Sequence, residues 1–516
     1  MTTSGLRVHR DSYVDSMLLM LGTASMDALD GVSWAGATLA NARGLDDLAA
    51  AGFSGGELDG LGANDLVLAV KADDEQTAGA ALDAGEQAVF SEQQAPQAGA
   101  HQEPPASIAE AVRRTEGLNV AIVSVPGEHA ALEAHHALTA GLHVLLFSDN
   151  VPLDQEVELK ERAAALGLLV MGPGAGTAVL GGTGLGFANA LGSTDGGAVG
   201  VVAAAGTGAQ EVSALLDRWG VRVSQVVGVG GRDLSEAVGG RMAQLAARAL
   251  DADPGTAAVL LVSKPASPAS AAAVLAECTG TPAVAVFLGL TEVEAPDGVT
   301  QAATLEQGAL AAARLAGATP PDVTTGLAAR VAEAAGRLPA SRTRVRGLFS
   351  GGTLCYEAQF VLEGLLGPVY SNEPLRKENT ADAAPAGAHV LLDLGAEEFT
   401  VGRPHPMIDP SSRLELLAAV RDETDVGVVL LDVVLGHGAH EDPAGQLAPV
   451  CAELSADGGP VVVAYLLGTE ADPQVYSRQR AVLEAAGCLV PETNARGAYA
   501  AAALVLRRPE VAETRP

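Results

Sequence analysis

The sequence is poor in basic residues. Its 516 residues include 31 lysines and arginines against 63 aspartates and glutamates, which gives a formal net charge of −32. Nucleic acids and anionic membrane surfaces both attract basic patches, so this charge argues against both as partners. A site for an anionic ligand must therefore create its own positive potential, and helix N-termini and a few arginines are the means available.

Cysteine is also scarce. The four cysteines, Cys278, Cys355, Cys451 and Cys488, show no metal or redox spacing, so we expect a reduced cytoplasmic compartment and no metal centre. The apolar run Met17–Leu21 is too short to span a membrane, and no basic segment precedes it as in a signal peptide. The sequence thus predicts a soluble intracellular protein.

Aromatic residues make up only 3% of the chain, whereas hydrophobic residues make up 48%. Small apolar side chains allow helices to lie close to strands, which favours layered α/β domains. A chain of this length is too long for one hydrophobic core, so we expect three or four domains.

Residues 1–90 are predicted to form a small α/β domain. The expected strands are Ser16–Gly22 and Asp65–Lys71, and the expected helices are Ser33–Ala42 and Asp74–Ala84. The polar, proline-rich residues 91–106 have no apolar period, and we interpret them as a linker.

Residues 107–192 are predicted to form a Rossmann-like domain, because strands alternate with helices of about a dozen residues. The expected helices are Ser107–Thr115, His129–Ala140 and Leu153–Leu166, and the expected strands are Asn119–Val125, His143–Phe147 and Leu168–Met171. The last strand runs into the glycine-rich turn Gly172–Gly176.

The rest of the chain contains two copies of one module, at 193–320 and 345–507. Strands are expected to begin near Val199, Val223, Ala258 and Ala283 in the first copy, and near Val345, His389, Val426 and Val461 in the second. A helix at Val323–Leu338 lies in the connection 321–344, and 508–516 is expected to be a loose tail. Two doubly wound parallel sheets with ligand turns at the carboxyl ends of their strands are the predicted architecture.

Each module carries a glycine turn between its first strand and first helix. These turns are Gly206-Thr207-Gly208-Ala209 and Ser350-Gly351-Gly352-Thr353. Free backbone N–H groups and the helix dipole make such a turn an anion cradle, and its repetition favours ligand binding. Tight turns without a ligand, with the threonines as N-caps, are the alternative.

A charged loop follows the predicted strand at His389. Residues 393–409 hold five charged residues and a histidine. Arg403 is suited to clamping a carboxylate or phosphate, and His405 to acid–base work or to polarising a carbonyl. Glu397 and Asp409 are further catalytic candidates. A structural loop is the alternative.

Several motifs resemble known families. Gly172-Pro173-Gly174-Ala175-Gly176 is similar to the end of the CoA-binding domain of the succinyl-CoA synthetase α subunit. Gly200–Glu211 and Gly228-Val-Gly-Gly-Arg-Asp233 resemble two further turns of that family. The resemblance makes Gly172, Pro173, Gly228, Gly230, Gly231 and Arg232 candidate cofactor-binding residues.

The FdrA family, acyl-CoA-synthetase-like proteins with an extra N-terminal domain, is more similar still. Its signatures resemble Leu185–Asn189, Gly228–Glu236 and Phe399–Pro410, and the resemblance covers nearly the whole chain. It implies a Rossmann-like CoA-binding-type domain followed by two flavodoxin-like synthetase modules.

The chain departs from the synthetases at their phosphorylated histidine. The segments that follow the closing strands, 288–296 and 467–473, contain no histidine, and Val262–Ala266 replaces the family's Gly-Glu-Ile-Gly-Gly turn. No ATP-grasp domain is recognisable either. The resemblance therefore implies that ATP would act only through a partner subunit.

The FdrA resemblance implies a subunit of oxamate carbamoyltransferase in purine and allantoin breakdown. That reaction converts carbamoyl phosphate and oxamate to oxalurate and phosphate, so the expected ligands are small anions and further protein subunits are expected partners. An acyl-CoA synthetase that binds CoA at 119–190 and works with an ATP-grasp partner is the runner-up. A non-catalytic scaffold or metabolite sensor is the third possibility. No cofactor is certain, and CoA is left open.

Overall fold

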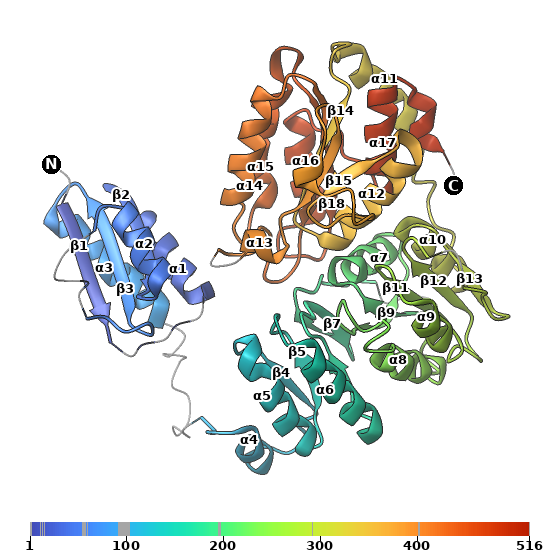
Figure 1. The fold of residues 1–516 in the computed structure, drawn as a ribbon, viewed down its shortest axis with the longest axis horizontal. Helices are drawn as coiled ribbons and strands as arrows, with labels where there is room; N and C mark the ends of the chain where they lie inside the picture. The colour runs from blue at the N-terminus through green and yellow to red at the C-terminus, as the bar shows by residue number, and fades with distance from the viewer. Residues whose placement is uncertain are drawn as a thin grey trace. The chain divides into compact units, whose positions relative to one another are not determined.

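The computed structural model describes residues 3–10, 12, 14, 16–53, 58, 60–90, 104–193, 198–290, 293–400 and 403–514. The chain divides into two compact units (Figure 1). The first comprises 1–104 with 402–404, and the second comprises 105–401 with 405–516. Most of the predicted linker lies outside the described residues.

The first unit is an antiparallel three-stranded sheet with helices on both faces. Its elements are β1 (Thr3–His9), α1 (Ser16–Asp27), β2 (Val32–Leu39), α2 (Ala42–Ala50), β3 (Leu66–Ala72) and α3 (Glu75–Phe90), and the strand order is β1-β3-β2. Alternate residues of β3 serve opposite faces: Leu66, Leu68 and Val70 pack with α1 and α3, whereas Val67 and Ala69 pack on the α2 side.

Two elements of this unit correct the sequence prediction. The predicted strand at 16–22 is the first part of α1, and the predicted helix at 33–42 is β2. The run Met17–Leu21 is apolar throughout, so it carries no period that separates a strand from a helix. β2 pairs with β3 along its whole length, and this pairing overrides the local preference of its alanines. The predicted strand at 65–71 and helix at 74–84 are confirmed as β3 and α3.

The second unit begins with the predicted Rossmann-like α/β segment. Its elements are α4 (Ile108–Arg114), β4 (Val120–Val123), α5 (Gly127–Thr139), β5 (His143–Leu146), α6 (Leu153–Leu166) and β6 (Val170–Met171). The three strands form a parallel sheet in the order β4-β5-β6. Ser107 caps α4 as its sequence position suggests, accepting a hydrogen bond from the backbone N–H of Glu110.

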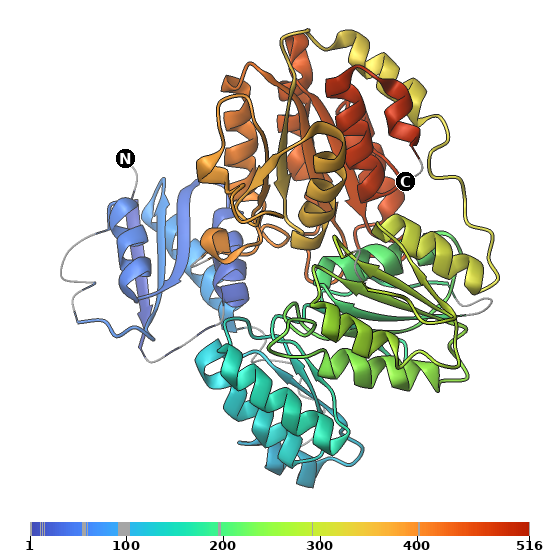
Figure 2. The same cartoon turned by 45° about the vertical axis from the view of Figure 1, so that its right-hand side comes forward.

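The first module is a seven-stranded sheet between two helical layers (Figure 2). Its parallel part consists of β9 (Val199–Ala204), α7 (Gly206–Arg218), β10 (Val223–Gly228), α8 (Arg241–Asp251), β11 (Ala258–Ser263), α9 (Pro268–Leu275), β12 (Ala283–Phe287), β13 (Val299–Gln301) and α10 (Leu305–Leu315). The antiparallel hairpin β7 (Thr177–Leu180) and β8 (Thr183–Gly186), which the sequence did not predict, extends the sheet through β10.

The second module repeats this order of strands. Its elements are β14 (Arg344–Phe349), α12 (Gly352–Leu366), β15 (Val369–Ser371), β16 (His389–Asp393), α13 (Glu397–Thr400), α14 (Ser411–Ala419), β17 (Val426–Val434), α15 (Pro443–Ser455), β18 (Val461–Leu467), α16 (Tyr476–Ala485) and α17 (Asn494–Leu506). The order β16-β14-β17-β18 corresponds to β10-β9-β11-β12 of the first module. The predicted doubly wound parallel sheets are thereby confirmed, and the four strands predicted in each module begin within one residue of their predicted positions. The edge strands β13 and β15 were not predicted.

One continuous hydrophobic core joins the two modules. Buried residues of α7 and α10 share this core with buried residues of α12 and α17. On the outer face of the first module, the core under α8 and α9 continues into the Rossmann-like segment. The outer face of the second module has a separate core under α14, α15 and α16. The helix of the connection is α11 (Leu327–Arg337), close to its predicted limits.

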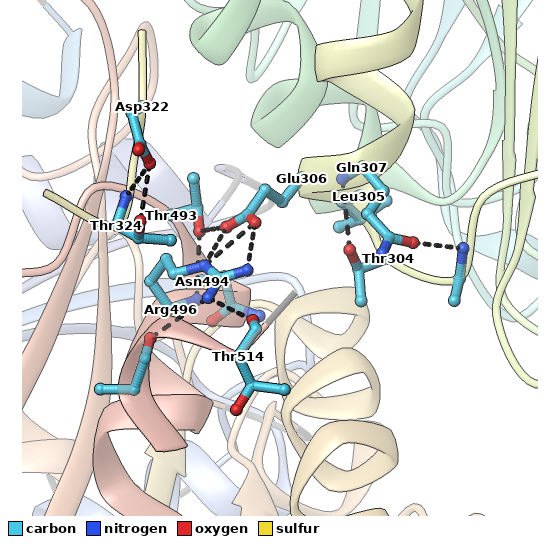
Figure 3. Close-up of polar contacts among 12 residues, drawn as sticks. Thr304, Leu305, Glu306, Gln307, Asp322, Thr324, Thr493, Asn494, Arg496 and Thr514 are labelled. Atoms are coloured by element: carbon cyan, nitrogen blue, oxygen red, sulfur yellow. Dashed lines mark hydrogen bonds and ion pairs between the residues drawn. The ribbon is translucent and has the colours of Figure 1, made fainter. Parts of the chain in front are cut away.

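The expected loose tail is a packed segment. Residues 509–513 form a short 3-10 helix in which Val511 and Ala512 are buried. Arg496 on α17 explains the packing: its guanidinium is buried, pairs with Glu306 of α10 at 2.6 Å and donates to the carbonyl oxygen of Thr514 at 2.8 Å (Figure 3). In the described part of the chain, no helix is long and apolar enough to cross a membrane.

Candidate functional site

The two predicted anion cradles meet in space. α7 begins at Gly206 directly after β9, and α12 begins at Gly352 directly after β14. The backbone N–H of Thr353 donates a hydrogen bond to Thr207 Oγ1 at 3.3 Å, so the first turns of the two helices touch. A helix N-terminus carries partial positive charge, and two of them at one place reinforce each other.

The first cradle has no acceptor among the described residues. Gly206 is exposed, whereas Thr207, Gly208 and Ala209 are buried. No described residue accepts a hydrogen bond from the backbone N–H groups of Gly206, Thr207 or Gly208, which is the state expected of a site that receives its acceptor from solution. A Cβ on Gly208 would lie 3.0 Å from the Thr353 methyl group, so glycine allows the two turns to approach.

The second cradle already binds a carboxylate of the protein. Asp432, at 0% exposure on β17, accepts hydrogen bonds from the backbone N–H groups of Ser350 at 2.8 Å and Gly351 at 2.7 Å. Its charge is balanced by the buried guanidinium of Arg413 at 2.9 Å. Of the four predicted residues, Ser350 and Gly351 therefore serve an internal anion. Gly351 and Thr353 lie against Thr207 of the first cradle.

Two charged residues that were not among the predicted site residues lie at the start of α12: Lys264, and Asp393 at the beginning of the charged loop. A Cβ on Gly352 would lie 2.4 Å from Asp393 Oδ2 and 3.1 Å from Lys264 Nζ. Lys264 comes from the first module, directly after β11, and Asp393 ends β16 of the second. The only sequence signal for Lys264 was that a lysine stands where the synthetases have a glycine-rich turn.

His405 lies beside the second cradle. The position that a Cβ on Gly395 would take is 2.6 Å from His405 Nε2 and 2.8 Å from the carbonyl oxygen of Ser350. Burial lowers the pKa of His405 to about 4, so its ring is neutral at pH 7. His405 Nδ1 accepts a hydrogen bond from the backbone N–H of Met407 at 3.2 Å, which assigns the ring proton to Nε2.

Among the described residues, no side-chain hydrogen bond or ion pair joins His405 to the other three catalytic candidates of the charged loop. Arg403 is exposed and falls in the first compact unit, and no described residue bonds to its guanidinium. Asp409 accepts hydrogen bonds from the backbone N–H of Ser411 at 2.9 Å and from its hydroxyl, at the start of α14. Glu397 is exposed at the start of α13. Their catalytic roles stay predictions.

The remaining predicted residues form a separate cluster. The turns at Gly172-Pro173 and Gly228-Val229-Gly230-Gly231 are pressed together, because a Cβ on Gly230 would lie 2.5 Å from the Gly172 carbonyl group. Gly230 also has a φ of +89°, which favours glycine. Arg232 donates to Glu156 at 2.8 Å and to the carbonyl oxygen of Val151 at 2.7 Å, so it is occupied by structural contacts.

Hydrogen bonds hold the segment 467–473, which follows β18 in the second module and takes the place of the synthetases' histidine loop. Asp472 accepts hydrogen bonds from the Asn189 amide at 2.8 Å and from the backbone N–H groups of Ala190 and Thr469 at 2.7 Å. Asn189 closes the Leu185–Asn189 motif, so this motif ties the first module to the segment after β18.

The comparisons with known proteins agree with this scaffold. Residues 348–504 match the CoA-ligase family, and residues 1–105 match the AllF heavy metal-associated domain. The uncharacterized protein YahF of Escherichia coli K12 is 36% identical over 499 residues, which cover 94% of this chain and 95% of that protein. The chain belongs to the YahF family. Its second module is a CoA-ligase domain, and the more specific FdrA assignment stays a prediction.

Solved structures offer remoter likenesses. A dinucleotide-forming acetyl-coenzyme A synthetase 1 of Ca. Korarchaeum cryptofilum is 14% identical, covers 79% of this chain and 86% of its own, and gives a TM-score of 0.33. ATP citrate lyase of Methanothrix soehngenii, in complex with citrate and coenzyme A, is 20% identical, covers 42% of this chain and 38% of its own, and gives a TM-score of 0.30. At these values neither structure informs the site.

The N-terminal match does not bring a thiolate metal site with it. Residues 1–105 contain no cysteine, although soft metals such as Cu(I) are selected by thiolate ligands. Among the described residues of the whole chain, no group of three or more His, Cys, Asp or Glu side chains is arranged to hold a metal ion. This unit therefore offers no thiolate, and its described residues form no cluster that fits a heavy-metal centre.

Proposed function

We propose that this chain is the substrate-binding subunit of a carbamoyl transferase built on a CoA-ligase-like scaffold. The specific reaction we assign is that of oxamate carbamoyltransferase in purine and allantoin catabolism. The observation that carries the proposal is the contact between Thr207 and Thr353, because it brings two helix N-termini to one anion-binding place.

The surrounding side chains suit the two small anions of this reaction. The open N–H groups at Gly206–Gly208 and the ammonium of Lys264 are the groups we assign to the phosphate of carbamoyl phosphate. The neutral ring of His405 offers its Nε2–H to the carbonyl oxygen, where negative charge grows during transfer. Arg403 remains our candidate clamp for the acceptor carboxylate.

The absence of a phosphohistidine supports transfer without ATP. Neither segment that follows a closing strand, 288–296 or 467–473, contains a histidine. Carbamoyl phosphate is already an activated donor, so its reaction with an amide requires no phosphorylated enzyme. Further subunits are expected partners, because the acceptor site is incomplete on the residues gathered here.

An acyl-CoA synthetase that depends on an ATP-grasp partner is the second candidate. The match of residues 348–504 to the CoA-ligase family favours it. Arg232, however, is already paired with Glu156, so the turn at Gly228 offers backbone N–H groups but no unoccupied guanidinium to the phosphates of CoA. A non-catalytic scaffold or metabolite sensor is the third candidate.

The test is an assay of the complex co-purified from its native source. Phosphate release from carbamoyl phosphate that requires oxamate supports the carbamoyl transferase. Formation of a CoA thioester with ATP, and without carbamoyl phosphate, would favour the synthetase instead. If neither reaction occurs in the intact complex, the chain is a scaffold or sensor.

A further inference from the structure

Asp393 is held in a fixed orientation beside the start of α12. It is 5% exposed, and the Asn372 side chain makes two hydrogen bonds to its backbone. The backbone N–H of Asp393 donates to Asn372 Oδ1 at 2.9 Å, and Asn372 Nδ2 donates to the carbonyl oxygen of Asp393 at 2.9 Å. Asp393 Oδ1 accepts a hydrogen bond from the backbone N–H of Gly395 at 3.0 Å. Asp393 Oδ2 accepts none from any residue that the structure describes.

The unpaired oxygen lies beside Lys264 at the start of α12. Asp393 Oδ2 and Lys264 Nζ both lie close to the position that a Cβ on Gly352 would take, at 2.4 and 3.1 Å. No ion pair joins the two groups within the described chain, so each keeps capacity for another partner. A buried carboxylate with one bound and one unbound oxygen is the arrangement expected of a group that exchanges a proton.

Several charged or titratable groups surround Asp393. Burial raises its pKa to about 6, Lys264 acts in the opposite direction, and Asp432 and Glu373 raise the pKa further. The buried thiol of Cys355 on α12 and the neutral ring of His405 complete the surroundings. A carboxyl group that titrates near neutral pH is suited to general acid–base catalysis.

We propose that Asp393 is the general base of the transfer and that Lys264 binds the departing phosphate. This inference rests on the proposed function. The amide nitrogen of the acceptor forms a bond to the carbamoyl carbon, and its proton moves to Asp393 Oδ2. The bond from that carbon to the phosphate oxygen breaks, and its electron pair leaves with phosphate. In the reverse direction, protonated Asp393 returns the proton to the leaving nitrogen.

An amide nitrogen is a weak nucleophile, so removal of its proton must accompany the attack. Proton transfer by a positioned side chain contributes about 100- to 10,000-fold to a rate. We therefore expect Asp393→Asn, which is nearly isosteric, to lower turnover of the intact complex by at least about 100-fold. The wild-type rate should fall on the acid side of about pH 6, and Asp393→Asn should lose this limb. Asp382→Asn, an exposed carboxylate with no described hydrogen bond or ion pair to Asp393 or Lys264, is the matched control.

Lys264→Met provides an independent variant, because Lys264 is only half-buried and makes no structural ion pair within the described residues. Loss of its charge should weaken binding of sulfate, a dianion that does not titrate near pH 6. It should also move the acid limb to higher pH, because Lys264 holds the pKa of Asp393 down. If the Lys264→Met variant is active and the acid limb of its pH–rate profile stays at the wild-type pH, the inference is overturned.

Sulfate binding separates this inference from the proposed function. A dianion beside Asp393 raises the carboxyl pKa, so binding near pH 6 should take up a proton, measurable by titration calorimetry in buffers of different ionisation enthalpy. Proton uptake should disappear in Asp393→Asn. An active wild-type complex whose Asp393→Asn variant keeps turnover and pH profile refutes the general base. If the wild-type complex releases no phosphate in the activity assay, the proposed transferase function is refuted. In that case, proton uptake on sulfate binding that depends on Asp393 would still place this carboxyl group at the anion.

Discussion

Glu357 accepts a hydrogen bond from the backbone N–H of Leu305 at 2.6 Å. Leu305 begins α10, the last helix of the first module, whereas Glu357 belongs to α12 of the second. The reciprocal contact joins Glu211 on α7 to the backbone N–H of Asn494, which begins α17, at 3.3 Å. Each module thus supplies a carboxyl group to the N-terminus of the other module's last helix, which locks the two anion cradles together.

These two carboxyl groups predict a pH-dependent stability. Burial raises the pKa of Glu211 to about 8 and that of Glu357 to about 7. In the unfolded chain these glutamates lose their protons at the ordinary glutamate pKa, whereas in the folded chain they keep them up to about pH 7–8. The free energy of unfolding should therefore fall as the pH rises from about 5 to about 8. Glu211→Gln and Glu357→Gln should flatten the fall, by an amount on the order of 2 kcal/mol between about pH 5 and about pH 8. Thermal midpoints measured across this range, with the exposed Glu398→Gln as control, provide the check. Parallel curves for all variants would contradict it.

The glycines at the two helix starts should differ in their tolerance of a side chain. Gly352→Ala would place Cβ 2.4 Å from Asp393 Oδ2, and Gly208→Ala would place it 3.0 Å from the Thr353 methyl group. Both variants should weaken sulfate or phosphate binding by about tenfold or more, since an anion cradle requires close backbone approach. Nothing lies within 4 Å of a Cβ on Gly206, so Gly206→Ala should retain most of the affinity. Isothermal titration calorimetry measures the affinity for sulfate or phosphate. If all three variants bind the anion with the same affinity, the glycine turns are not an anion cradle.

Two variants of the charged loop, His405→Ala and Arg403→Ala, should lose activity for different kinetic reasons. Loss of one preorganised donor typically lowers turnover by about 100- to 1,000-fold. We expect this loss for His405→Ala and for Arg403→Ala in the assembled enzyme, with folding intact. His405→Ala should lower kcat, because Nε2–H acts on the transition state, whereas Arg403→Ala should chiefly raise KM for the acceptor carboxylate. Wild-type kinetics in both variants would make the loop structural.

The ion pair between Arg496 and Glu306 predicts the largest loss of stability. Both side chains are almost fully buried, so removal of one partner leaves an uncompensated buried charge. Arg496→Ala should cost about 3–5 kcal/mol and should also release residues 508–514, whose carbonyl groups Arg496 binds. The exposed pair of Arg508 and Glu510 is the matched control, since Arg508→Ala should change stability by less than about 1 kcal/mol. Thermal unfolding and limited proteolysis of the C-terminus measure both effects.

The N-terminal unit predicts weak metal binding. Without cysteine in residues 1–105, we expect the full-length protein to bind Cu(I) there no more tightly than scattered surface groups do. Competition with a chromophoric chelator at neutral pH measures the affinity. Tight, stoichiometric binding that survives alkylation of Cys278, Cys355, Cys451 and Cys488 would overturn this expectation.

The sequence by itself determined the repeated architecture. The four strands predicted in each module begin within one residue of their predicted positions, because buried parallel strands are continuous apolar runs bounded by glycine turns. The same reasoning located the two cradles, since a glycine turn between a strand and a helix is a local pattern. α6 was predicted over its full extent, Leu153–Leu166, because its ends and period are local as well.

Tertiary structure decided whatever depended on distant partners. β2 became a strand because β3 pairs with it, and residues 508–514 became ordered because Arg496 reaches them from α17. The composition of the site followed the same rule. Lys264 and Asp393 lie more than a hundred residues apart in the sequence, and only the packing of the modules brings both to Gly352. Asp432 fills the second cradle for the same reason, since hydrophobic period and turn chemistry carry no information about which distant side chain meets a helix start.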